Sequence, residues 1–128
     1  MADLYVDDVM SRPAETASAD TLLREAAATL IEQDVGSVVV VDDADRIEGL
    51  LTATDFVRIT RDGGAAHDAT VGEFMRTDVV TTRRSAAVSE VVDAMLDQLV
   101  HHVPVVENDE VVGMVTTFDL AARLGRSL

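Results

Sequence analysis

The chain has 128 residues, and 48% of them are hydrophobic, so it can bury the core of about one ordinary domain. It contains no cysteine, which excludes disulfides and cysteine-ligated metals. Twenty-four acidic residues against ten basic ones give a formal net charge of −14. A field of that sign repels phosphate backbones and disfavours nucleic-acid binding.

The basic residues are all arginine, and lysine is absent. Acidity without lysine resembles the proteins of salt-loving microbes, in which concentrated salt screens self-repulsion. An acidic protein from a GC-rich genome is the alternative, because arginine codons displace lysine codons there. No apolar run approaches the roughly 18–20 residues of a membrane span, and the acidic amino terminus lacks the basic and apolar regions of a signal peptide. We therefore expect a soluble, cytoplasmic protein.

The first half reads as strand–helix–strand–strand–helix. Asp20 is the predicted N-cap of a helix over 21–33. Ser37–Val41 (SVVVV) is typical of a strand buried on both faces. The turn residues Asp42–Asp45 lead into IEGLL and predict a hairpin, which a short helix at Thr54–Arg61 follows. The apolar stripe of the first helix contains Leu23, Ala26, Ala27, Leu30 and Ile31.

The second half follows a linker at Arg61–Ala69 and repeats the same order of elements. Ser85 is the predicted cap of its first helix. His102–Val106 is the counterpart of the buried strand, the turn Glu107–Asp109 leads into VVGMV, and a helix is predicted at Thr117–Leu124. The apolar positions of the first helix are Val88, Val91, Val92, Met95, Leu96 and Leu99.

A shift of 65 positions aligns the two halves, and one deletion changes the shift to 64 from the hairpin onward. This is a tandem duplication, with predicted domains at 1–64 and 65–128. The fold class is α/β (α+β), with two related halves expected to pack around a pseudo-twofold axis and to leave equivalent clefts. The aligned pairs include Val6/Val71, Met10/Met75, Thr16/Thr81, Glu25/Glu90, Val38/Val103, Val40/Val105, Gly49/Gly113, Thr52/Thr116 and Asp55/Asp119.

One motif occurs in both halves, as GLLTATD at Gly49–Asp55 and GMVTTFD at Gly113–Asp119. Thr52 and Asp55 fit a capping box at the start of a helix. The same carboxylate could instead accept both hydroxyls of a ribose, and the threonine with the free amides of a helix start would suit a phosphate. The glycine allows something to approach the backbone closely. The residues alone leave both interpretations open.

The order of these motifs resembles the CBS domain, named after cystathionine β-synthase. VDDVMSRPAET (Val6–Thr16), SVVVVDD and GLLTATD carry the first copy, and VGEFMRTDVVTT, HHVPVVEND and GMVTTFD carry the second. Two such domains in tandem form a Bateman module. The resemblance implies a β-α-β-β-α fold in each half and regulatory binding of AMP, ADP, ATP or S-adenosylmethionine. It implies no catalysis and no required cofactor.

The same resemblance assigns ligand contacts to two sets of residues. For the valines, plain core packing is the alternative. The first set is Thr16, Ser37, Val38, Thr52, Thr54 and Asp55. The second set is Thr81, His101, His102, Val103, Pro104, Thr116, Phe118 and Asp119.

The histidine pair makes the two predicted sites unequal, because Gly36 and Ser37 stand where the second half has His101 and His102. Protonated histidines could contact a phosphate near a pKa of about 6.5. Adjacent strand residues point to opposite faces, so a metal site is disfavoured. We therefore expect phosphate on the Asp119 side and an uncharged or cationic group on the Asp55 side. Other candidates for a phosphate are Arg58, Arg83, Arg84 and Arg123, with solvated surface charge as the alternative.

The sequence contains no nucleophile elbow, Walker loop or zinc-protease motif, so we do not expect an enzyme. A ligand-free interaction scaffold is the competing hypothesis. The family resemblance implies a homodimer in a flat four-domain disc, in which apolar positions of Phe56–Ile59 and Phe118–Leu124 could pair. The regulated partner would be a separate, unknown protein.

Overall fold

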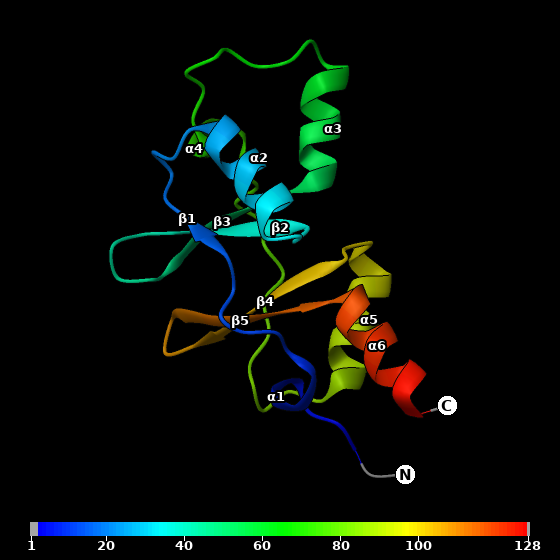
Figure 1. Ribbon diagram of the computed structural model, residues 1–128. Helices are drawn as coiled ribbons and strands as arrows, with labels where there is room; N and C mark the ends of the chain where they lie inside the picture. The colour runs from blue at the N-terminus through cyan, green and yellow to red at the C-terminus, as the bar shows by residue number, and fades with distance from the viewer. Residues whose placement is uncertain (1–2, 128) are drawn as a thin grey trace. The chain divides into compact units, whose positions relative to one another are not determined.

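The computed structural model describes residues 3–127 and forms two compact units. Unit 2 is the continuous stretch 15–79, whereas unit 1 combines the segment up to Ala14 with the stretch from Val80 onward. In Figure 1 the blue α1 accordingly lies beside the C-terminal helix α6, which it contacts. Each unit thus holds most of one sequence repeat and the opening segment of the other. The repeat boundary between residues 64 and 65 stays a prediction about the sequence.

The described residues contain eleven helices and strands. In chain order they are α1 (Val6–Val9), β1 (Thr16–Ala17), α2 (Leu23–Glu32), β2 (Ser37–Val41), β3 (Ile47–Thr52), α3 (Ala53–Arg61), α4 (Val71–Phe74), α5 (Val88–Gln98), β4 (His102–Glu107), β5 (Glu110–Thr116) and α6 (Thr117–Ser127).

Unit 2 is built on a three-stranded sheet in which β1 is parallel to β2 and β2 is antiparallel to β3. All five residues of β2 are buried, as predicted for this valine run. Alternate residues share a face, and Val38 and Val40 point into the same core as helix α2. The buried cluster contains Leu23, Ala26, Leu30, Val38, Val40, Leu51, Ala69 and Val71.

The start of α2 corrects a prediction, because Asp20 is not its N-cap. The helix begins at Leu23, and Leu22 occupies the cap position in extended conformation without a side-chain cap bond. The amide of Leu23 donates to the carbonyl of Ala69 at 2.8 Å. A neighbouring segment therefore satisfies one of the amides that a helix start leaves without an intrahelical partner.

Helix α5 repeats this correction in unit 1. It begins at Val88 with Ala87 at the cap, so Ser85 lies two residues too early. The amide of Val88 donates to the carbonyl of Leu4 at 2.9 Å, again from the opening segment of the other repeat. Both helices were predicted early because the preceding polar residues resemble caps in sequence, while tertiary contacts set the actual start.

Unit 1 contains the antiparallel pair β4–β5. The strand predicted before α5 is reduced to a single parallel bridge between Thr82 and Val105, whereas β1 pairs with β2 at both Thr16 and Ala17. The buried cluster of this unit contains Val6, Val91, Met95, Val103, Val105 and Val115.

Three apolar positions predicted for the helix stripes lie at the surface. Ile31 on α2 is 81% exposed, and Leu96 on α5 is 68% exposed. Leu99, which ends α5 in a left-handed conformation, is 84% exposed. The apolar face of each helix is therefore wider than the strip that its own unit covers.

The opening segment of each repeat completes the sheet of the unit it joins. Arg76 exchanges two backbone hydrogen bonds with Leu50 of β3, at 2.9 and 3.0 Å. Ser11 exchanges two with Met114 of β5, at 2.8 and 2.9 Å. These bridges place the residue after Met75 or Met10 beside the strand that leads into the last helix of the unit.

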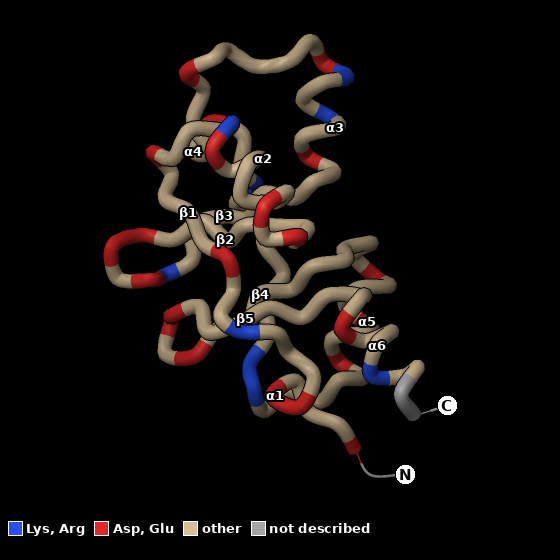
Figure 2. Tube along the Cα trace, viewed as in Figure 1, with Lys and Arg blue, Asp and Glu red and all other residues tan. Residues whose placement is uncertain are grey.

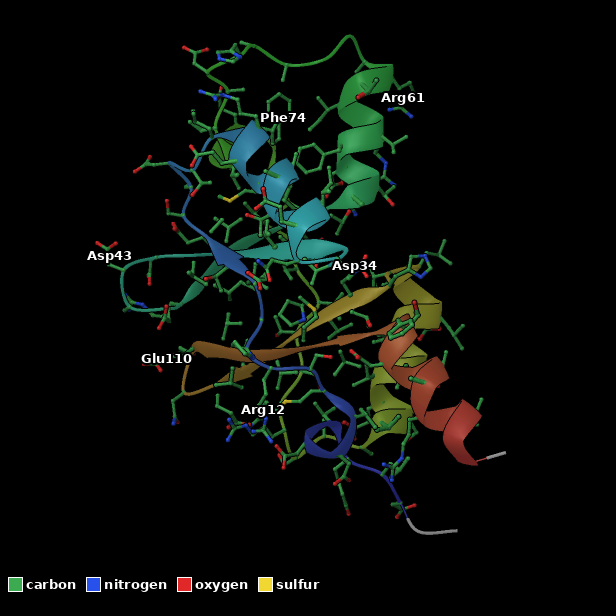
Figure 3. All side chains as sticks on the ribbon, viewed as in Figure 1. Arg12, Asp34, Asp43, Arg61, Phe74 and Glu110 are labelled. Carbon is green, nitrogen blue, oxygen red and sulfur yellow. The ribbon has the colours of Figure 1, made fainter. Side chains whose placement is uncertain are left out.

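Acidic residues recur along both units, and several lie in the hairpin turns (Figure 2). Figure 3 labels Asp43, in the β2–β3 turn, and Glu110, the first residue of β5 after the β4–β5 turn. Asp45, Asn108 and Asp109 have positive φ angles, which aspartate and asparagine tolerate better than most residues. None of the helices among the described residues has the length and apolar character needed to cross a membrane.

Candidate functional site

The GLLTATD and GMVTTFD motifs form the same strand-to-helix junction in both units. The Thr52 hydroxyl accepts from the Asp55 amide at 3.4 Å, and the Asp55 carboxylate accepts from the Thr52 amide at 2.8 Å. In unit 1 the Asp119 amide donates to Thr116 at 3.1 Å, and the Thr116 amide donates to Asp119 at 2.9 Å. The predicted capping boxes are therefore present at α3 and α6.

Each junction is tied to the start of the preceding strand. The Ala53 amide donates to the Gly36 carbonyl at 2.9 Å, and the Thr117 amide donates to the His101 carbonyl at 3.1 Å. The strand register places one further predicted residue opposite each capping threonine: Ser37 opposite Thr52, and His102 opposite Thr116.

The glycine of each motif permits close approach by the chain itself. A Cβ on Gly49 would lie 2.7 Å from the Met75 sulfur and 2.8 Å from the Arg76 carbonyl oxygen. A Cβ on Gly113 would lie 2.8 Å from the Ser11 carbonyl oxygen. The close approach expected at these glycines is thus explained by the bridging segments, without a ligand.

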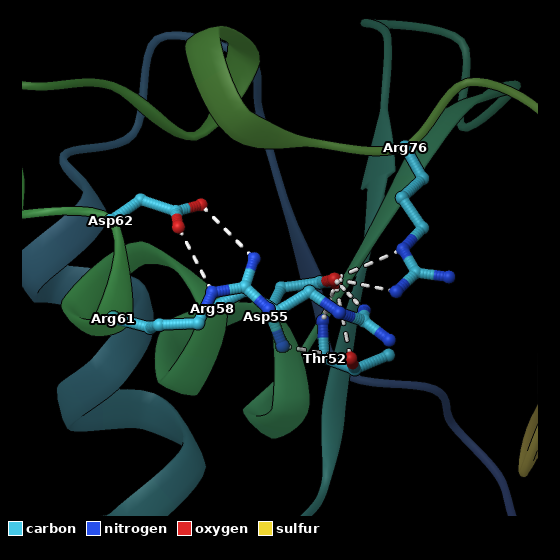
Figure 4. A network of polar contacts seen from close by, with 6 residues as sticks. All are labelled: Thr52, Asp55, Arg58, Arg61, Asp62 and Arg76. Carbon is cyan, nitrogen blue, oxygen red and sulfur yellow. Dashed lines mark hydrogen bonds and ion pairs between the residues drawn. The ribbon is translucent and has the colours of Figure 1, made fainter.

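Asp55 is surrounded by cationic groups (Figure 4). One carboxylate oxygen, Oδ2, accepts from the amide and the hydroxyl of Thr52. The other, Oδ1, accepts from Nη1 of Arg58 at 3.2 Å and from Nε of Arg76 at 2.9 Å, and Nη2 of Arg76 lies 2.9 Å away. The Asp55 side chain is only 8% exposed. Both of its oxygens are thus engaged within unit 2.

Asp119 has a different set of partners. Its Oδ2 accepts from the amide and hydroxyl of Thr116, and its Oδ1 accepts from the Ser11 hydroxyl at 2.7 Å. These donors are uncharged, and the residue is partly buried. Because the repeats align Ser11 with Arg76 and Ala122 with Arg58, the two junctions share geometry but differ in charge.

Sequence reasoning missed Arg76 and Ser11 as parts of these junctions. The repeat alignment does place the two residues at equivalent positions, because each directly follows one of the aligned methionines, Met10 and Met75. What the sequence did not reveal is that each of these residues pairs with a strand of the other repeat's unit.

The remaining predicted site residues lie along the same sheets or at the helix starts. Thr16 pairs with Val39, two residues beyond Ser37 on β2. Val38, Val103 and Pro104 are buried core residues. Thr54 and Phe118 are exposed in the first turns of α3 and α6.

Thr81 lies at a cavity of about 770 Å³ in unit 1. Of the predicted site residues, Thr81 and the phosphate candidate Arg83 line this cavity. The other lining residues are Thr82, Arg83, Ser85, Ala86, Glu90, Val106, Asn108 and Asp109. The cavity is therefore lined by the segment that precedes α5, the first turn of α5, the end of β4 and the β4–β5 turn, rather than by the Asp119 junction.

The two histidines differ in exposure, since His101 is exposed while His102 is partly buried in β4. Across the residues that the structure describes, no group of three or more His, Asp or Glu side chains is placed to hold a metal ion.

Comparison with known proteins identifies the family. A sequence model of the CBS domain matches residues 6–62 and again residues 71–126. The chain belongs to the CBS-domain family. The fold predicted from the tandem repeat is confirmed, and CBS pairs of this kind are regulatory modules.

Three relatives show how far the similarity extends. Hypoxic response protein 1 of Mycobacterium tuberculosis is 30% identical over 118 residues, covering 91% of this chain and 82% of that protein. The CBS domain pair of protein MJ0100, in complex with 5′-methylthioadenosine and S-adenosyl-L-methionine, has a TM-score of 0.91 at 27% identity and covers 99% of this chain and 100% of that one. A structure of Hypoxic Response Protein I with two coordinated zinc ions has a TM-score of 0.80 at 29% identity and covers 94% and 98%.

Proposed function

We propose that this CBS pair is a regulatory module that binds an adenosine-containing ligand through the Asp119 junction and signals to a separate protein. The observation that carries the proposal is the chemistry of Asp119. In the contacts described above, the donors to its carboxylate are the Ser11 hydroxyl and the Thr116 amide and hydroxyl, all of them uncharged. The carboxylate lies at the start of α6. A ribose diol supplies two hydroxyl donors that such a carboxylate can accept.

The class of ligand is supported by the MJ0100 CBS pair, which holds 5′-methylthioadenosine and S-adenosyl-L-methionine. The first of these compounds carries no phosphate, and the second is a cation. Both suit a chain with a formal net charge of −14 better than ATP without a metal. In this proposal the ligand is an effector, and the module has no catalytic role.

A thermal-shift screen tests the proposal directly. Because the chain has no tryptophan, an external dye or circular dichroism must report unfolding. The screen compares 5′-methylthioadenosine, S-adenosylmethionine, AMP, ADP and ATP. A ligand at about 100 times its Kd stabilises the folded state by about 2.7 kcal/mol, which raises Tm by several degrees.

The decisive variant is Asp119→Asn, with Asp93→Asn on the exposed surface of α5 as the charge-matched control. We expect the ligand-induced shift in the wild type and in the control, and its loss in Asp119→Asn. A shift that survives Asp119→Asn, or no shift with any adenosyl compound, would contradict the proposed site.

A ligand-free scaffold that assembles as a homodimer is the second candidate function. Exposed apolar side chains on α5 and α6 favour it, whereas Phe56 and Ile59 pack into the core of unit 2 and leave only Val57 exposed from that predicted stretch. The exposed side chains are Leu96, Leu99, Phe118 and Leu124. Analytical ultracentrifugation of the Leu96→Glu variant tests it: a dimer that becomes monomeric supports assembly through this face, and an unchanged mass excludes it.

We also propose that the acidic surface adapts the protein to concentrated salt. Salt screens the repulsion among the excess acidic side chains, which give a formal net charge of −14, and should therefore stabilise the folded state. The expected result is a Tm that rises steadily between low and molar KCl; a Tm independent of KCl would favour the GC-rich-genome explanation.

A further inference from the structure

Unit 1 carries an exposed apolar patch, formed by Leu96, Leu99 and Phe118, that unit 2 does not repeat. We propose that this patch is the docking surface for a partner protein that presents an apolar helix face flanked by basic residues. The inference rests on the proposed signalling to a separate protein and names the surface at which that protein binds. It does not depend on which ligand the Asp119 junction holds.

The first observation is the conformation of Leu99 at the end of α5. Its φ is 55° and its ψ is 46°, in the left-handed region that glycine, asparagine and aspartate enter more readily than leucine. The Val100 amide donates to the Met95 carbonyl at 3.1 Å and closes the helix end. A glycine at position 99 would allow the same closure without strain. The helix ending therefore does not explain the leucine.

Helix α2 ends in the same way, with a residue better suited to the conformation. The Val35 amide donates to the Leu30 carbonyl at 3.1 Å, and Asp34, labelled in Figure 3, has a φ of 53°. The repeats align Asp34 with Leu99. Because Leu99 is 84% exposed, packing within its own chain does not compensate for the strain. Strain and exposure together indicate that another molecule covers Leu99.

Two further apolar side chains extend the patch. Leu96 lies one turn before Leu99 on α5 and is 68% exposed. Phe118, at the start of α6, is 78% exposed. The Thr117 amide donates to the His101 carbonyl at 3.1 Å, so the start of α6 lies close to the chain that leaves α5. The patch therefore draws on two helices of one unit.

The comparison of repeats shows that the fold does not require this patch. Both units have the same helix ending and the same strand-to-helix junction. Two of the three aligned residues are nevertheless polar in unit 2. The residues aligned with Leu96, Leu99 and Phe118 are Ile31, Asp34 and Thr54.

The charge of α5 indicates the chemistry of the partner. Helix α5 contains Glu90, Asp93 and Asp97 but no basic residue. Asp93 lies one turn before Leu96, and both Asp93 and Asp97 are exposed. Basic residues beside an apolar helix face would therefore complement this side of the patch.

A second copy of the chain complements the patch less well. Two copies would bring two acidic α5 helices together, each in a chain with a formal net charge of −14. The predicted disc would also pair apolar residues of α3 with α6. Phe56 and Ile59 of α3 instead pack into the core of unit 2. We therefore assign the patch to a different, basic partner.

Titration of the isotope-labelled protein with synthetic helical peptides, followed by nuclear magnetic resonance, tests the patch. The probe has leucine along one face and lysine on both flanks, and in its matched control glutamate replaces each lysine. At constant ionic strength, we expect the lysine peptide to shift the amide signals of Leu96, Leu99 and Phe118 saturably. The glutamate peptide should bind at least 10-fold more weakly. No saturable shift at these residues, or equal binding of both peptides, would overturn the proposal.

Substitutions taken from unit 2 separate apolar docking from general charge attraction. Leu99→Asp introduces the residue type of the aligned position and adds a negative charge, which by itself would strengthen binding of the lysine peptide. We expect Leu99→Asp and Phe118→Thr each to weaken binding at least 10-fold. Ile31→Ser, which removes an exposed apolar side chain from α2, should weaken it less than 2-fold. Equal weakening by Ile31→Ser would overturn the assignment to unit 1.

The Tm of Leu99→Asp tests the strain argument in concentrated salt, which screens the added charge. Because aspartate tolerates the left-handed region better than leucine, the Tm should equal or exceed that of the wild type. A lower Tm would show that Leu99 stabilises its own chain and would overturn the assignment of a free surface.

Analytical ultracentrifugation decides between a separate partner and a second copy. A monomer, or a dimer that Leu99→Asp leaves intact, supports a separate partner. A dimer that Leu99→Asp dissociates would show that a second copy occupies the patch and would overturn the proposal. Because the peptide titration contains no adenosyl compound, its failure would refute the patch alone and leave the Asp119 site to the thermal-shift screen.

Discussion

The junctions at Asp55 and Asp119 are built alike but are not chemically equivalent. Both have a capping box, a glycine beneath a bridging segment and a backbone bridge to the residue after a methionine. That bridging residue is Arg76 in unit 2 and Ser11 in unit 1. The motif therefore fixes the geometry of the junction, while one residue from a distant segment fixes much of its charge.

The largest difference between the junctions is expected on removal of the aspartates. Asp55→Ala removes the cap and leaves two guanidinium groups facing each other, which should destabilise the protein by about 2–4 kcal/mol. Asp119→Ala removes a cap and one hydroxyl contact and should cost about 1 kcal/mol. Urea unfolding followed by circular dichroism measures both. Equal losses would mean that the arginines are not coupled to Asp55.

A test of the shared geometry is Gly49→Ala. Its Cβ would meet backbone of Arg76 at 2.8 Å, so the bridge must shift, at a cost of about 1–3 kcal/mol. Gly113→Ala should behave alike, because its Cβ would meet the Ser11 carbonyl.

Gly125→Ala is the matched control for both glycine variants. This glycine lies in α6, and the position that a Cβ would occupy has no other atom within 4 Å, so alanine should stabilise the helix by up to about 1 kcal/mol. Destabilisation by Gly125→Ala, or none by Gly49→Ala, would contradict the close-approach explanation.

The smallest expected effect concerns the hairpin turns. The backbone amides of Arg46 and Ala44 both donate hydrogen bonds to the Asp42 carboxylate. These bonds, that of Arg46 most strongly, lower the pKa of the Asp42 carboxyl. A lowered folded-state pKa means that the charged form contributes stability above the unfolded pKa of about 3.9 and loses it as pH falls through the folded value. The Tm of Asp42→Asn should therefore lie slightly below that of the wild type at neutral pH. The difference in Tm between the two proteins should shrink in acid, where the Asp42 carboxyl is protonated. A difference in Tm that grows in acid would contradict the lowered pKa of Asp42.

Much of the fold could be predicted from sequence because it depends on local patterns. The valine run of β2, the hairpins and both capping boxes follow from residue type and spacing. The starts of α2 and α5 could not, since Ala69 and Leu4 supply backbone acceptors from far along the chain.

The chemistry of the site was harder to predict than its position. Thr52, Asp55, Thr116 and Asp119 were found by their repetition. The ion pair between Asp55 and Arg76 was not, because Arg76 lies 21 residues away along the chain and is placed beside Asp55 by its backbone bridge to Leu50. Tertiary pairing of this kind leaves no periodic signal in a single sequence.

The most direct test of this difference is calorimetric titration of 5′-methylthioadenosine into Asp119→Asn and Asp55→Asn. We predict that Asp119→Asn weakens binding at least 10-fold relative to the wild type, while Asp55→Asn changes it less than 3-fold. Equal weakening in both variants, or weakening confined to Asp55→Asn, would contradict the division of roles between the two junctions.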